Sequence, residues 1–227
     1  MMHIILNTAE FDREWAYETM ASILSAEMRV VIIPLSENSG WSDETVYYQD
    51  MIRSKGDYAK KLILPFRHYG IPRRNITVLE HYDEDPDTAA AKIIGADLVL
   101  LTGGDPYSCL HAMEDMGLDR ILDNYHGILM SCGAAASALS ETFISGEYEE
   151  HGLGILPGFD LDAQYEEDAE HVGALIRTLE NHLRQILIIP PEGGVLIDEN
   201  ECALFGEAFI ADANDLEELY LLEESLL

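Results

Sequence analysis

The chain has 227 residues, of which 48% are hydrophobic and 25% charged, a composition typical of a globular protein with a sizeable core. Asp and Glu number 43 against 13 Lys and Arg, which gives a formal net charge of −30. A field of this sign repels nucleic-acid phosphates and anionic membranes, so we expect neither as a partner. Three cysteines without CxxC spacing are too few for a disulfide framework.

No apolar run is long enough to span a bilayer, and the stretch MMHIILNTAEFD turns polar too early for a signal peptide. We therefore expect a soluble, cytoplasmic protein. No repeat, low-complexity segment or change of composition divides the chain, so we expect one α/β domain over residues 1–227. The oligomeric state is left open, a homodimer included.

Short β-branched segments alternate with helical patterns along most of the chain. The expected elements are, in chain order, a strand over 2–7, a helix over 12–27, a strand over 29–34, a helical stretch ending near 69, a strand over 75–80, a helix over 87–95 and strands over 96–102 and 127–131. This βαβα order predicts a three-layer α/β sandwich with a mostly parallel, doubly wound, flavodoxin-like sheet. Beyond residue 145, short strands around a helix over 168–184 indicate a small antiparallel extension, and 215–227 form an acidic amphipathic end.

Ligands of doubly wound sheets bind beyond the carboxyl ends of the strands, and two such ends stand out. The first is LLTGGDPY, residues 100–107, where Asp105 followed by Pro106 is good capping chemistry for a helix. Gly103 and Gly104 lack a Cβ atom, which lets backbone N–H groups approach a ligand as an oxyanion hole requires. The pair alone is a weak motif.

The second strand end is GILMSCGAAASAL, residues 127–139, which has the small residues of a nucleophile elbow. A frame centred on Ser131 keeps Gly133 at +2 but has Leu129 at −2, whereas a frame centred on Cys132 has glycine at neither place. The spacing therefore favours Ser131 as the nucleophile, with Cys132 starting the helix and giving its N–H to an oxyanion hole. Plain close packing of strand and helix explains the same small residues.

Four segments, LLTGGDPYSCLHAM, GILMSCGAAA, GLGILPGFD and IIPPEGG, occur here in the order found in one family. The chain resembles the dipeptidase E/cyanophycinase family of serine peptidases, whose fold is like that of class I glutamine amidotransferases. The likeness runs from the first strand to about residue 210. It implies that Ser131 is the nucleophile, that Gly103, Gly104 and Asp105 form the oxyanion and substrate turn, and that Glu192 completes the triad.

The general base departs from the family pattern. The resemblance implies a His followed by an aromatic residue after the LPG segment, and Gln164 and Tyr165 stand there. An amide cannot accept the serine proton at neutral pH. His171, oriented by Glu192, is the nearest candidate for a relocated base, and His151 is a second. Gln164 itself could bind substrate or orient water.

The acidic segment HYDEDPD, residues 81–87, fits a helix start better than a metal site, and no HExxH, EF-hand, Walker A or GxGxxG pattern occurs. We therefore expect neither metal nor cofactor. The leading hypothesis is hydrolysis of a small peptide by Ser131, His171 and Glu192. The alternatives are a catalytically impaired relative that binds a small peptide or amino acid, and amidotransferase-type chemistry with Cys132 as the nucleophile.

Overall fold

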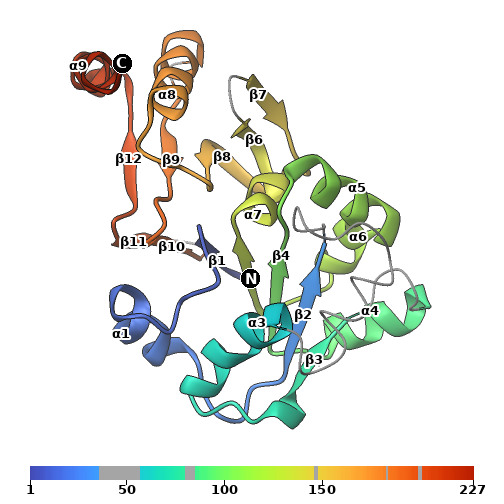
Figure 1. The fold of residues 1–227 in the computed structure, drawn as a ribbon. Helices are drawn as coiled ribbons and strands as arrows, with labels where there is room; N and C mark the ends of the chain where they lie inside the picture. Colours follow the sequence, from blue (N-terminus) through green and yellow to red (C-terminus); the bar gives the residue numbers. More distant parts are fainter. Residues whose placement is uncertain (36–56, 80–84, 146–147, 183, 199–200) are drawn as a thin grey trace.

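The computed structural model describes residues 1–35, 57–79, 85–145, 148–182, 184–198 and 201–227, and within them a seven-stranded main sheet forms the centre of the fold (Figure 1). Its strands are β1 (Met2–Leu6), β2 (Val30–Pro34), β3 (Ile76–Val78), β4 (Leu98–Thr102), β5 (Ile128–Cys132), β10 (Gly193–Ile197) and β11 (Cys202–Gly206), in the spatial order β11-β10-β1-β5-β4-β2-β3. Strands β1 to β5 pair in parallel, and β10 and β11 add an antiparallel edge. The predicted mostly parallel α/β sheet is therefore confirmed.

Helices cover both faces of the main sheet because its central strands are apolar on both sides. Alternate side chains such as Ile4 and Ile5 belong to two different hydrophobic clusters. One cluster includes α1 (Glu14–Ile23) and α3 (Asp57–His68), and the other includes α4 (Pro86–Ile94), α5 (Pro106–Met116), α6 (Leu118–Leu122) and α7 (Ala134–Leu139). Helix α1 is shorter than predicted because Leu24 leaves the helical region for an extended conformation. The start of the predicted helical stretch before α3 lies outside the described residues.

A second sheet, of five strands in the described residues, lies beside the first (Figure 1). Its strands are β6 (Ser140–Ser145), β7 (Tyr148–His151), β8 (Leu156–Asp162), β9 (Ile186–Ile188) and β12 (Phe209–Ala211), in the order β12-β9-β8-β6-β7, and α8 (Ala169–His182) packs with α9 (Leu216–Leu226) next to it. Strand β8 pairs in parallel with both β6 and β9, so this part is larger and more mixed than the predicted antiparallel extension. The reason is α8, a crossover long enough to bring β9 back parallel to β8.

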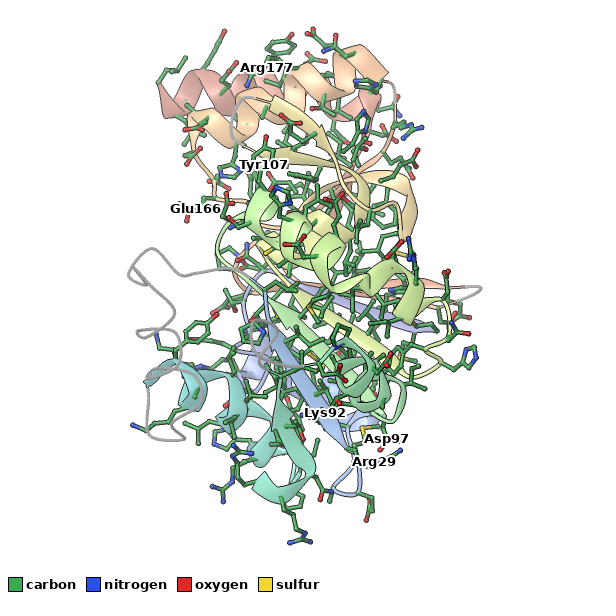
Figure 2. All side chains as sticks on the ribbon, turned by 90° about the vertical axis from the view of Figure 1, so that its right-hand side faces the viewer. Arg29, Lys92, Asp97, Tyr107, Glu166 and Arg177 are labelled. Carbon is green, nitrogen blue, oxygen red and sulfur yellow. The ribbon has the colours of Figure 1, made fainter. Side chains whose placement is uncertain are left out.

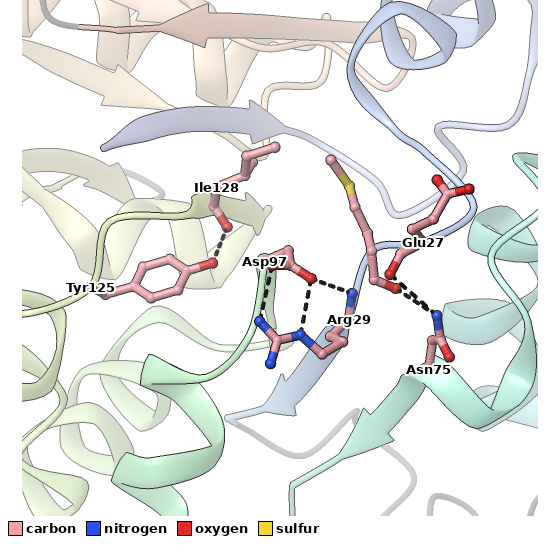
Figure 3. Close-up of polar contacts among 7 residues, drawn as sticks. Glu27, Arg29, Asn75, Asp97, Tyr125 and Ile128 are labelled. Carbon is pink, nitrogen blue, oxygen red and sulfur yellow. Dashed lines mark hydrogen bonds and ion pairs between the residues drawn. The ribbon is translucent and has the colours of Figure 1, made fainter.

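Polar contacts tie together the loops at the amino end of the parallel strands (Figure 3). The Asp97 carboxylate accepts hydrogen bonds from the backbone N–H of Arg29 at 2.8 Å and from two nitrogens of its guanidinium at 3.1 Å each. The Tyr125 hydroxyl donates to the Ile128 carbonyl at 3.0 Å. The opposite, carboxyl end of the strands is the end at which doubly wound sheets bind ligands. Among the described helices, none has the length and apolar character needed to cross a bilayer.

Candidate functional site

A cleft of about 420 Å³ lies at the carboxyl ends of β1, β4 and β5, a volume within the range of small-molecule sites. The residues that line it come from these strand ends, from α3 and from the segment after β8: Asn7, Thr8, Ala9, Glu10, Tyr58, Lys61, Leu62, Thr102, Gly103, Cys132, Gly133, Gln164 and Glu166. We call it the elbow cleft. Its position is the one that the strand order predicts for a binding site.

The sharp turn between β5 and α7 is centred on Gly133, which has φ 52° and ψ −123°. Its N–H donates to the Leu6 carbonyl at 2.9 Å, which ties the turn to the end of β1. A Cβ atom added at Gly133 would lie only 3.1 Å from the Asn7 carbonyl oxygen, so both the backbone angles and the space favour glycine. A strained strand-to-helix turn facing a cleft is where a nucleophile elbow presents its nucleophile. The turn therefore falls two residues beyond Ser131, the centre that the sequence predicts.

Ser131 lies inside β5, where it pairs with Ile5 of β1 and Leu101 of β4. It is 1% exposed and does not line the elbow cleft. Successive side chains of a strand point to opposite faces, so Ser131 shares a face with Leu129 while the next residue faces the cleft. Relative to Gly133, the small residues at −2 and +2 are Ser131 and Ala135, which explains why a small side chain is needed at 131. The catalytic role of Ser131 stays a prediction.

Cys132 is the last residue of β5 and lines the cleft. It does not start the helix as expected, because Gly133 makes the turn and α7 begins at Ala134. Burial raises the pKa of the Cys132 thiol well above its ordinary value. The thiolate is the nucleophilic form, so this environment gives no support to Cys132 as a nucleophile.

The glycine turn after β4 contributes to the same cleft. Gly103 lines it, and Gly104 is exposed at the next position. The Asp105 carboxylate accepts a hydrogen bond from the Ser108 N–H at 2.7 Å, so Asp105 is the N-cap of α5, as its capping pattern predicts. Immediately before the glycines, the Thr102 side chain is 3% exposed and lines the cleft, and its hydroxyl has no hydrogen-bond partner among the described residues.

Gln164 faces the turn from the segment that follows β8. A Cβ atom built on Gly133 would lie 3.6 Å from Cγ of Gln164. The Gln164 N–H donates to Oδ1 of Asp162 at 3.2 Å, which fixes the backbone of this segment. Gln164, which stands where the family resemblance places the base, therefore contacts Gly133, the centre of the elbow.

His171 is held by Asp162 and not by Glu192 as predicted. Its Nδ1 lies 2.9 Å from Oδ2 of Asp162, which is 1% exposed at the end of β8. This hydrogen bond is the main cause that raises the pKa of His171, and burial opposes it. Glu192 is exposed beside β10, and His151 is exposed on β7. Neither these two residues nor His171 lines the elbow cleft.

The charges of the elbow cleft are mixed. Lys61 is its one cationic lining residue in the described part of the chain, against the carboxylates of Glu10 and Glu166. Glu10 is paired with Arg13, whose Nε lies 3.3 Å from its Oε2. Figure 2 shows Glu166 at the molecular surface, and Arg177 at the end of the molecule formed by α8. Among the described residues, no group of three potential metal ligands is placed to hold an ion.

The sequence did not predict the roles of three residues in this region. They are Gly133 as the centre of the turn, Asp162 as the partner of His171, and Thr102 as a cleft residue with an unpartnered hydroxyl among the described residues. A frame centred on Gly133 would have shown small residues on both sides, and glycine is the residue that best tolerates positive φ. Asp162 carried a weaker signal, an acidic residue at the end of an apolar strand. The unsatisfied hydroxyl of Thr102 depends on three-dimensional contacts and leaves no trace in the sequence.

Comparison with solved structures finds chains of similar fold, two of which are named as peptidases. A structure from Listeria monocytogenes EGD-e, provisionally named peptidase E, matches with a TM-score of 0.63 and 13% identity, covering 89% of this chain and 96% of that chain. A peptidase from an acI-B1 Actinobacterium matches with a TM-score of 0.61 and 15% identity, covering 93% of this chain and 89% of that chain. No family model and no curated protein matches the chain. The fold of this chain is therefore similar to that of these peptidase E-like structures, in agreement with the resemblance of its ordered motifs.

Proposed function

We propose that this chain is a peptidase E-like protein whose elbow cleft binds a short peptide or amino acid without a nucleophilic side chain at the turn. The observation that carries the proposal is Gly133 at the strained centre of the elbow. Covalent catalysis there needs a hydroxyl or thiol, and glycine supplies neither. Gln164, the residue facing Gly133, supplies an amide where proton transfer needs a base.

The cleft lining supports a peptide-like ligand. The cleft is lined by residues that carry hydroxyl, amide, ammonium or carboxylate groups. They are Asn7, Thr8, Thr102, Gln164, Lys61, Glu10 and Glu166. These groups match the amide bonds and the two charged ends of a short peptide. The similarity of the fold to two peptidase structures points to the same ligand class.

Binding is tested by titrating dipeptides into the protein in a calorimeter, with mass spectrometry of each mixture afterwards. We expect binding with the peptides recovered intact. Gln164→Ala should weaken binding several-fold, because the side chain faces the turn at which the ligand lies. Gln185→Ala is the matched control, since Gln185 is exposed outside the cleft and should leave the affinity unchanged. If no dipeptide binds, or if Gln164→Ala binds as well as the unmodified protein, the proposal is wrong.

The second candidate is hydrolysis of short peptides of the dipeptidase E type, with Ser131 as the nucleophile. The observation in its favour is the contact between Asp162 and His171, because a buried carboxylate that orients an imidazole through Nδ1 is part of a catalytic triad. This mechanism requires Ser131 to become accessible from its position inside β5. Consumption of Asp-Xaa or isoaspartyl dipeptides by the unmodified protein, lost in Ser131→Ala and kept in Ser137→Ala, would establish it. Ser137 is a suitable control because it is buried to the same 1% on α7.

A further inference from the structure

Thr102 is a buried polar residue of the elbow cleft. Its side chain is 3% exposed, ends β4 beside Gly103, and lines the cleft. Its Oγ1 has no hydrogen-bond partner among the described residues. A buried hydroxyl without a partner is costly, and native proteins retain few of them. A ligand in the cleft would supply the missing partner.

The charges around Thr102 restrict the ligand. Among the described residues, two carboxylates, Glu10 and Glu166, line the cleft against the single ammonium of Lys61. Two arginines that could balance further negative charge lie outside the cleft. Arg184 lies 3.7 Å from Glu141 and 3.8 Å from Asp160, and Arg177 is on α8 outside the cleft. The whole chain adds a formal charge of −30, which disfavours an anionic ligand.

We propose that the elbow cleft binds a zwitterionic amino acid or short peptide without net negative charge. A carbonyl or carboxylate oxygen of the ligand accepts a hydrogen bond from the Thr102 hydroxyl, and the ligand's free ammonium lies toward Glu166. This inference rests on the proposed peptide-binding function and specifies its ligand.

The test compares Ala-Leu, Asp-Leu and N-acetyl-Ala-Leu, titrated into the unmodified protein and three variants. Ala-Leu should bind at least about 5-fold more tightly than either other peptide, because Asp-Leu adds a negative charge and acetylation removes the ammonium. Thr102→Val should weaken Ala-Leu binding about 3- to 10-fold, the loss of one hydrogen bond. Its melting temperature should stay equal or rise, because a methyl group replaces an unsatisfied hydroxyl of similar shape. Glu166→Gln should reduce the difference between Ala-Leu and its acetylated form.

Thr142→Val is the matched control for Thr102→Val. Thr142 is also buried, at 4% exposed, but its hydroxyl donates to the Asp160 carboxylate and it lies outside the cleft. This variant should lose thermal stability and keep its affinity for Ala-Leu. Equal Ala-Leu affinity in Thr102→Val, or tighter binding of Asp-Leu than of Ala-Leu, would overturn the inference while leaving peptide binding intact. If no peptide of the set binds, the proposed function itself fails.

Discussion

Replacing Gly133 by alanine tests the elbow most directly. Gly133 has φ 52° and ψ −123°, and a residue with a Cβ atom in this conformation is strained by about 1–3 kcal/mol. The new Cβ would also lie 3.1 Å from the Asn7 carbonyl oxygen, so the backbone must shift slightly. In the opposite direction, alanine lowers the conformational entropy of the unfolded chain, which stabilises the folded state by about 0.4–1 kcal/mol. We expect a net loss in the free energy of unfolding of about 2 kcal/mol.

Gly117→Ala is the matched control. Gly117 also has positive φ, 60° with ψ 37°, but a Cβ atom there would meet nothing within 4 Å. Its net cost should therefore be about 1 kcal/mol or less. In a chain of this size, each kcal/mol lowers the melting temperature by about 2–4 °C. Urea and thermal unfolding should thus place Gly133→Ala about 4–8 °C below the unmodified protein, and clearly below Gly117→Ala.

Gly133→Ala should also change the affinity of the cleft for dipeptides. The added Cβ would lie 3.1 Å from the Asn7 carbonyl oxygen and 3.6 Å from Cγ of Gln164, so it would shift two residues that line the cleft. Gly133→Ala should therefore also weaken dipeptide binding, whereas Gly117→Ala should not. If Gly133→Ala is as stable as Gly117→Ala, the turn does not hold the strained geometry, and the assignment of the elbow to Gly133 is refuted.

Two further predictions follow from the titratable groups. Because the hydrogen bond to Asp162 raises the pKa of His171 in the folded state, its stabilisation is complete below the ordinary value of 6.5 and is lost as the pH rises through the raised value. His171→Gln should therefore lose more stability at pH 5.5 than at pH 9 in urea unfolding, and the reverse order would contradict this account. A thiol reagent at pH 8 should rapidly modify the exposed Cys202 but not the buried Cys132, whose pKa burial raises further. A rapid phase that persists in Cys202→Ser and disappears when Cys132→Ser is added would show that Cys132 is accessible.

The main sheet was predictable from the sequence because its strands are nearly continuous apolar runs separated by helical patterns. Segments such as VVIIP and LVLLT are buried along their whole length, and this pattern distinguishes central parallel strands from solvated ones. The second sheet was harder to predict. Its pairing depends on a crossover through α8 and on two strands of only three residues, β9 and β12, which leave little periodicity. The prediction of a single domain over residues 1–227 stays a prediction.

The place of the site was predictable, but the roles of its residues were not. The strand ends and their glycines indicated the edge of the sheet at which the candidate cleft lies, and Gly103, Cys132 and Gln164 all line this cleft. The turn centre differed by two residues because Ser131, Cys132 and Gly133 are all small, and composition does not show which of them adopts positive φ. Likewise, spacing could not show which carboxylate lies next to His171, since that contact joins the end of β8 to a helix nine residues later in the chain.

The two features that argue against covalent catalysis lie against each other. Gly133 comes from the turn after β5, and Gln164 comes from the segment after β8, yet Gln164 contacts the position that a side chain at 133 would occupy. The scaffold of an elbow is nevertheless kept, with small residues on both sides of the turn and an N–H bond that ties the turn to β1. Thr102, whose buried hydroxyl has no hydrogen-bond partner among the described residues, lines the same cleft. A strained turn that has glycine at its centre and an amide side chain facing it supports the proposal that the cleft binds a peptide without cleaving it. Both candidate functions, peptide binding and peptide hydrolysis, require that the peptide binds. A measured affinity will therefore discriminate between them only when the same sample is also tested for cleavage of the peptide.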